Sequence, residues 1–209
     1  MSTPEKEDAC VICGTYGPIT RDHIPPQKCF PKPRPSDLIT VPACLECNGG
    51  RSDLDDKFQV FLGAIARGGS QEGDNLWEER KKRLDENRKF KREFLDGLFF
   101  SGGRPKTKID LVQFSPIYDN IFRGLYFKHF GSIYPPEKEF EMHIEQKITP
   151  ETAGLAQRLF KGKVGSDQFL HGINATDEDS TVVAGLLIFY NCFSVIGLGG
   201  MPDHPERIG

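Results

Sequence analysis

Four cysteines near the N-terminus could hold a metal ion together. They form two pairs in which two residues separate the thiols, Cys10 with Cys13 and Cys44 with Cys47. This spacing lets both thiolates of a pair reach one tetrahedral Zn²⁺ ion from a tight turn, and four protein ligands leave no open position for catalysis. We therefore predict a structural zinc site, in preference to four free buried thiols.

The N-terminal residues 1–8 are polar and acidic and lack the pattern of a secretory signal. We expect the chain to be cytoplasmic, where reduced cysteines favour metal binding over disulfide formation. The two remaining cysteines, Cys29 and Cys192, are expected to be small packed side chains.

The segment between the cysteine pairs carries side chains suited to phosphodiester hydrolysis. Asp22 and His23 are adjacent there, and Asn48 directly follows the second pair. This reaction needs a base that activates water and a cation that stabilises the charge developing on the phosphate. Carboxylate and amide oxygens suit Mg²⁺ or Mn²⁺, so Asp22 and Asn48 are candidate ligands. Alternatively, His23 only packs or forms a hydrogen bond, and Asn48 is a left-handed turn residue.

In this arrangement the sequence resembles the HNH endonuclease family. The family motif has the order Cys-x2-Cys, Asp-His-x-x-Pro, Cys-x2-Cys-Asn and then a basic residue. Besides the cysteines, the matching residues are Asp22, His23, Pro26, Asn48 and Arg51. The resemblance covers about residues 8–67 and implies a zinc-bound ββα-metal module. It implies that His23 is the general base and that Asp22 and Asn48 hold a catalytic Mg²⁺ or Mn²⁺ ion.

Two positions depart from the family pattern. Relatives carry an intermediate asparagine shortly before the second cysteine pair, whereas residues 36–42 contain none, and Asp37 is the candidate replacement. Some relatives have a further histidine ligand four residues after the motif asparagine. This chain has Ser52 there, and Asp53 or Asp56 is the candidate substitute.

Charge is distributed unevenly along the chain. The net charge of −3 excludes a strong overall attraction to nucleic acid, but residues 77–108 hold 11 basic and 6 acidic side chains. This segment is either a helix that grips the phosphate backbone or a solvated face with internal ion pairs. The candidate substrate-binding residues are Arg80, Lys81 and Arg83 in this segment, and Gly49, Gly50 and Arg51 just after the second cysteine pair.

Apolar periodicity and turn residues predict an α+β fold in three segments. Residues 1–69 form the zinc module, which ends in a helix with apolar residues at helical spacing between Phe58 and Ile65. Residues 70–105 form a charged helical connector, with a helix near residues 75–98 and a linker after it. Residues 106–209 form a mixed α+β domain to which the sequence assigns no role.

Within the last segment we expect several strands and two helices. The strands lie near residues 108–114, 139–146, 168–174, 181–190 and 192–198, and the helices lie near residues 116–130 and after residue 149. The run from Val182 to Gly200 has no charged side chain and is long enough to cross a bilayer as a helix. Its glycines and β-branched residues favour a buried hairpin, so we expect no membrane partner.

These patterns predict a metal-dependent endonuclease that hydrolyses nucleic acid, with DNA as the expected substrate. The alternative is a non-catalytic four-cysteine zinc module that binds nucleic acid or a protein partner. One nuclease site per chain would make double-strand cleavage easier for a homodimer.

Overall fold

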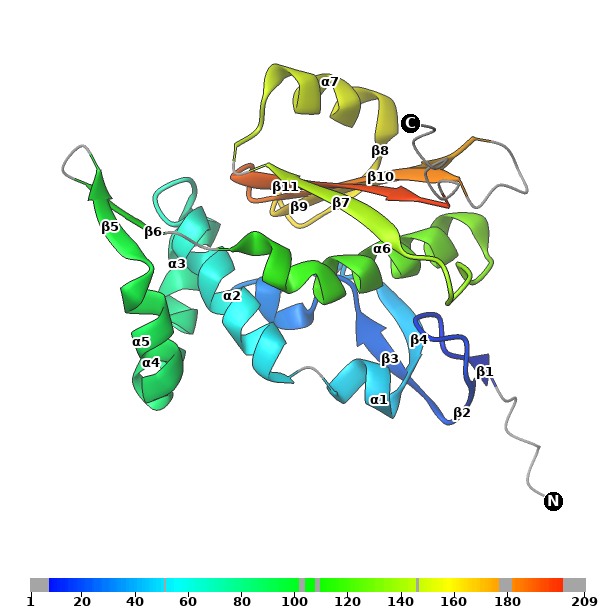
Figure 1. Cartoon of the computed structure of the whole chain (residues 1–209), viewed down its shortest axis with the longest axis horizontal. Coiled ribbons are helices and arrows are strands. Elements are labelled where there is room, and N and C mark those ends of the chain that lie inside the picture. The colour runs from blue at the N-terminus through cyan, green and yellow to red at the C-terminus, as the bar shows by residue number, and fades with distance from the viewer. Residues whose placement is uncertain are drawn as a thin grey trace, which may run out of the picture.

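The computed structural model describes residues 8–50, 52–101, 104–107, 110–145, 147–176 and 182–200. A small N-terminal unit with two short hairpins, a group of helices and a larger antiparallel sheet lie against one another (Figure 1). This confirms the predicted α+β class.

The N-terminal unit contains two hairpins followed by two helices. The elements are β1 (Asp8–Ala9), β2 (Tyr16–Gly17), β3 (Ile19–His23), β4 (Thr40–Cys44), α1 (Leu45–Gly49) and α2 (Ser52–Ala66). β1 pairs with β2 and β3 with β4, all antiparallel, and a short 3-10 helix (Gln27–Cys29) lies in the long β3–β4 connection. The predicted helix is confirmed by α2, which buries Phe58, Phe61 and Leu62 at helical spacing.

The charged segment that follows is broken into three helices and a hairpin. The elements are α3 (Gln71–Arg80), α4 (Lys82–Glu86), α5 (Arg88–Asp96), β5 (Leu98–Ser101) and β6 (Arg104–Thr107). Asn87 interrupts the helix because its backbone is extended and its side chain accepts a hydrogen bond from the Phe90 amide, which starts α5 as a new helix. The expectation of a linker after residue 100 is wrong, since β5 pairs with β6 in a hairpin that projects from the molecule (Figure 1).

The C-terminal part is a five-stranded antiparallel sheet with a helix on each face. The elements are a 3-10 helix (Leu111–Phe114), α6 (Ser115–Phe130), β7 (Phe140–Glu145), α7 (Pro150–Leu159), β8 (Phe160–Val164), β9 (Phe169–Ala175), β10 (Val183–Phe189) and β11 (Phe193–Gly199). The strand order is β7-β11-β10-β9-β8. In Figure 1, α7 covers one face, and α6 lies between the other face and the N-terminal unit.

Most of the expected C-terminal elements are present. The apolar run forms the β10–β11 hairpin, and no helix among the described residues is long and apolar enough to cross a membrane. The strand expected near residues 108–114 is wrong for residues 111–114. They form a 3-10 helix because the Asp110 carboxylate accepts a hydrogen bond from the Val112 amide and directs the chain into α6. The sequence patterns did not indicate β8.

Two glycines let α6 lie close to the sheet. A Cβ atom on Gly185 of β10 or on Gly197 of β11 would come within 2.5 Å of the Phe122 ring of α6. The ring therefore fits over two adjacent strands only because both positions lack a side chain. This contact sets how far α6 stands from the sheet, and thus where its opposite face meets the N-terminal unit.

One hydrophobic core joins the N-terminal unit, α6 and the sheet. Phe58 of α2 lies at their junction, where its ring centroid is 5.2 Å from that of Phe114, 5.7 Å from that of Tyr118 and 5.7 Å from that of Phe189. A side chain in this place supports the packing of all three parts.

Phe58→Ala is expected to lower the free energy of unfolding by about 3–5 kcal/mol, because it removes a fully buried ring from a shared core. Urea unfolding followed by circular dichroism measures the change. The control is Phe160→Ala, whose ring is 53% exposed on β8 and whose loss should cost less than about 1 kcal/mol. Equal costs for the two variants would contradict a shared core at Phe58.

Candidate functional site

The four paired cysteines come together at one end of the N-terminal unit. Their sulfur atoms all lie within 4.8 Å of one another, and the Cys13 and Cys44 sulfurs are 3.9 Å apart. A tetrahedral zinc ion with Zn–S bonds of about 2.3 Å places its sulfurs about 3.8 Å apart. The cluster therefore has the size and the donor atoms of a four-thiolate zinc site.

Local backbone structure explains how the two cysteine pairs meet. Cys10 and Cys13 lie in the tight turn between β1 and β2, which Gly14 completes with a left-handed backbone at a φ of 74°. Cys44 ends β4 and is the N-cap of α1, so that its sulfur accepts a hydrogen bond from the Cys47 amide. A hydrogen bond of 3.0 Å from the Val11 amide to the Pro42 carbonyl joins the turn to β4.

Two thiols of this cluster, those of Cys10 and Cys47, need a cation to become thiolates, whereas hydrogen bonds with Thr15 and the neighbouring cysteines outweigh burial and lower the pKa of Cys13 to about 6. Burial raises the pKa of the Cys10 thiol, and burial together with the neighbouring cysteines raises the pKa of Cys47. A zinc ion would displace the protons and neutralise the thiolate charges. The side chains present thus fit a structural zinc ion.

The β3–β4 hairpin leads from the cysteine cluster to the predicted catalytic residues. In its register Ile19 lies opposite Cys44, and His23 lies opposite Thr40 at the other end. α1 follows β4 directly and packs beside β3. The side-chain nitrogen of Asn48 donates hydrogen bonds to the Thr20 hydroxyl (2.8 Å) and to the Arg21 carbonyl (3.3 Å). The amide nitrogen of Asn48 is therefore engaged by β3, and its oxygen is left for another partner.

A small cavity collects the predicted catalytic residues. It is lined by Asp22, His23, Ile24, Pro26, Cys47, Asn48, Asp55, Ile117, Asn120 and Ile121. Its volume of about 20 Å³ is room for roughly one water molecule or one ion. The structure thus brings Asp22, His23 and Asn48 together next to the four-cysteine cluster, since Cys47 belongs to both.

His23 is held in an environment that favours its neutral form. Partial burial, and secondarily the positive charge of Arg34, lower the pKa of its imidazole below the ordinary value. A neutral imidazole can accept a proton, which is what a general base requires.

Asn48 is a helical residue of α1 and is absent from the positive-φ positions among the described residues, so the alternative of a left-handed turn is wrong. Gly49 and Gly50 are exposed where α1 ends, and a Cβ atom on Gly50 would lie 2.5 Å from the Glu46 carbonyl oxygen. Gly50 is thus needed for the end of α1 itself. Arg51, predicted to bind phosphate, lies outside the described residues.

Asp37, the candidate replacement for the intermediate asparagine, and Asp53 and Asp56, the candidates for the further histidine ligand, lie away from this cavity. The Asp37 carboxylate accepts hydrogen bonds of 3.1 and 3.2 Å from the Gly165 amide, in the turn between β8 and β9. Asp53 and Asp56 line a different cavity. The acidic residue of α2 that lines the cavity with Asp22 and His23 is Asp55, which sequence reasoning missed. The sequence did contain a signal for Asp55, because the residue lies one turn into a predicted helix that starts shortly after Asn48.

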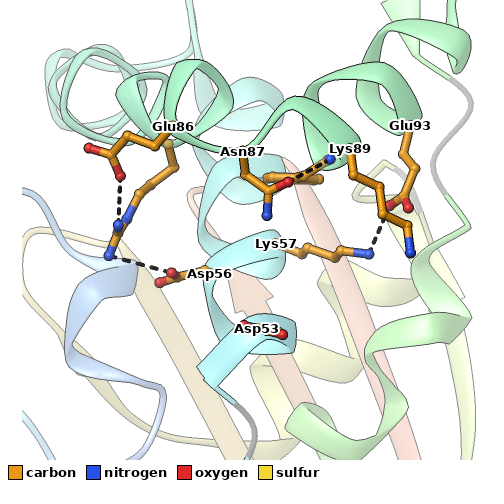
Figure 2. A pocket seen from close by; sticks show the side chains of 9 residues that line it. Asp53, Asp56, Lys57, Glu86, Asn87, Lys89 and Glu93 are labelled. Atoms are coloured by element: carbon orange, nitrogen blue, oxygen red, sulfur yellow. Dashed lines mark hydrogen bonds and ion pairs between the residues drawn. The ribbon is translucent and has the colours of Figure 1, made fainter.

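The basic segment presents mixed charge. A second cavity, of about 370 Å³, lies between α2 and the α4–α5 pair (Figure 2). It is lined by Asp53, Asp56, Lys57, Arg83, Glu86, Asn87, Lys89, Phe90 and Glu93. Figure 2 shows Lys57 paired with Glu93 across it, at 2.8 Å, and Arg83 lies 2.6 Å from Glu86 and 3.4 Å from Asp56. Acidic side chains thus neutralise much of the basic charge at this cavity.

The individual basic candidates differ in accessibility. Arg80 is 8% exposed and paired with Glu79 at 2.7 Å, which leaves it little room to contact a phosphate. Lys81 forms an ion pair with Glu78 on the same helical segment. Within α4 and α5, the basic residues that form no ion pair with another described residue are Lys82, Arg88, Lys89 and Arg92, and all are exposed.

Comparison with known proteins adds no identification to this geometry. No family model, curated protein or solved structure matches the chain.

Proposed function

We propose that the chain is a metal-dependent endonuclease of the HNH type that hydrolyses phosphodiester bonds of nucleic acid, with DNA as the expected substrate. The observation that carries this proposal is that Asp22, His23 and Asn48 line one cavity directly beside a four-cysteine cluster. In this proposal the β3–β4 hairpin with α1 is the ββα-metal unit, and the zinc ion holds its base together.

In the proposed reaction His23 accepts a proton from a water molecule that attacks the phosphorus atom. The neutral state that its environment favours is the one required for this step. Asp22 and Asn48 would hold Mg²⁺ or Mn²⁺, which supplies charge stabilisation on the phosphate when bound. By the family's pattern the products would carry 5′-phosphate and 3′-hydroxyl ends.

The size of the cavity limits how the substrate approaches. About 20 Å³ cannot hold a nucleotide, so the scissile phosphate would have to lie at the rim, where Gly49 and Gly50 are exposed. Contacts farther along the nucleic acid would come from the exposed basic side chains of α4 and α5 that have no ion-pair partner in the described part of the chain, such as Lys82 and Arg88.

The test is a cleavage assay with purified, zinc-loaded full-length protein on supercoiled plasmid, linear duplex and RNA side by side. We expect nicking of plasmid that requires Mg²⁺ or Mn²⁺ and stops when the divalent ion is withdrawn while zinc stays bound. An inert protein on all three substrates with either ion would contradict the proposal. Binding of the same substrates without cleavage would instead favour the non-catalytic zinc module.

A further inference from the structure

The face of α6 that covers the proposed site carries a single amide. Ile117, Asn120 and Ile121 line the catalytic cavity, at the i, i+3 and i+4 positions of one helical face. One turn further, Gly124 leaves the space that the Ile24 side chain occupies, because a Cβ atom there would overlap it. α6 is therefore packed tightly against the residue that follows His23.

Asn120 is 7% exposed, and its side chain forms no hydrogen bond with another described residue. Among the described residues, the Asn120 amide is not one of the fully enclosed polar groups that lack a partner, so it keeps access to the cavity that the residue lines. The apolar neighbours on the same face would be better matched by another apolar side chain. An unpartnered amide that lines a cavity thus points to a ligand in that cavity.

The other polar groups of the cavity define the chemistry of the ligand. Asp22 and Asp55 contribute carboxylates. Asn48 contributes its amide oxygen, since its nitrogen already donates to Thr20 and Arg21. Oxygen donors of this kind, two of them anionic, favour a hard divalent cation, and the cavity has room for a single ion.

We propose that the side-chain oxygen of Asn120 is a ligand of this divalent ion, together with Asp22, Asn48 and Asp55. The inference rests on the proposed function and deepens it, because it assigns one ligand to a helix outside the HNH-like motif. The ion site would then be complete only when α6 is docked on the β3–β4 hairpin. Residues 8–67 alone would lack one ligand.

The test is a titration of Mn²⁺ into zinc-loaded full-length protein, with free Mn²⁺ measured by electron paramagnetic resonance. Asn120→Leu removes the oxygen but keeps an apolar side chain of similar size beside Ile117 and Ile121. We expect it to raise the dissociation constant for Mn²⁺ by about 10-fold or more. Asn120→Asp keeps an oxygen ligand and adds a negative charge, so it should bind Mn²⁺ at least as tightly as the wild type.

The control is Asn174→Leu, which makes the same substitution at an exposed position of β9 and should leave Mn²⁺ affinity unchanged. Thermal melts of all variants report whether the fold is intact. A purely structural role for Asn120 would make the leucine and aspartate variants bind Mn²⁺ as the wild type does, and this result would overturn the inference. A wild type that binds no Mn²⁺ at millimolar concentration would overturn it as well.

The inference and the proposed function fail in different ways. Affinity for Mn²⁺ that depends on Asn120, in a protein that cleaves no nucleic acid, would support the ligand and reject the nuclease. Cleavage by the wild type, with unchanged Mn²⁺ affinity in Asn120→Leu, would support the nuclease and reject the ligand.

Discussion

His23→Ala is expected to reduce metal-dependent cleavage of nucleic acid by about 100- to 10,000-fold, which is the usual loss when a general base is removed. Substrate binding should change little, because the proposed role of His23 is proton transfer. Single-turnover cleavage of a labelled duplex at saturating protein measures the rate, and a binding titration in Ca²⁺ measures affinity separately.

The pH dependence of the wild type follows from the same residue. Burial, with a smaller effect of Arg34, lowers the pKa of His23 below its ordinary value. Only the unprotonated imidazole can accept a proton, so cleavage should be lost as the pH falls through this lowered pKa. We therefore expect activity to persist at pH values somewhat below the ordinary histidine pKa.

The control for His23→Ala is His143→Ala, since the side chain of His143 is 72% exposed on β7. It should cleave at the wild-type rate. Similar losses in both variants would indicate a nonspecific effect, and full activity in His23→Ala would reject His23 as the base.

Removal of the zinc ion is expected to unfold the N-terminal unit and abolish cleavage. β1 and β2 are only two residues each, so bound zinc would add to the packing of Val11 and its hydrogen bond to Pro42, which hold this turn against β4. Structural zinc contributes about 10–16 kcal/mol to the folding of isolated zinc-finger peptides. We expect a smaller net loss here, because Val41 and Phe58 also anchor the unit in the shared core.

The double variant Cys44→Ser/Cys47→Ser tests this expectation. Elemental analysis should show about one zinc ion per wild-type chain and none in the variant. The variant should melt at a clearly lower temperature and lose cleavage. Cys192→Ser is the matched control, because this thiol lies in the turn between β10 and β11. Full zinc occupancy in the double variant would reject the four-cysteine site.

The placement of both thiols of each cysteine pair could be predicted because this information is local. Two residues between thiols place both in one turn, whatever the rest of the chain does. α6, β7 and the β10–β11 hairpin could be predicted for a similar reason. Their apolar periodicity, capping residues and turn residues all lie within the element itself.

Other elements depend on pairing or capping that their own residue types do not specify. The β5–β6 hairpin and β8 have short, ambiguous sequences whose strands exist because another strand pairs with them. The helix expected between residues 75 and 98 is broken at Lys81 and at Asn87, and at Asn87 the capping side chain competes with helix continuation. The helix propensities of the neighbouring residues do not predict whether a helix continues through Asn87 or ends there.

The same distinction between local sequence and tertiary packing applies to the candidate site. The spacing of the cysteines in the sequence is sufficient to propose the zinc site, and the resemblance to the HNH family implies the roles of Asp22, His23 and Asn48. The positions of Asp55 and Asn120 at the cavity depend on packing, because α2 and α6 reach it only when the shared core around Phe58 and the Phe122–glycine contact are formed. Spacing along the chain specifies ligands within one turn or hairpin, whereas a ligand from another helix depends on how that helix docks.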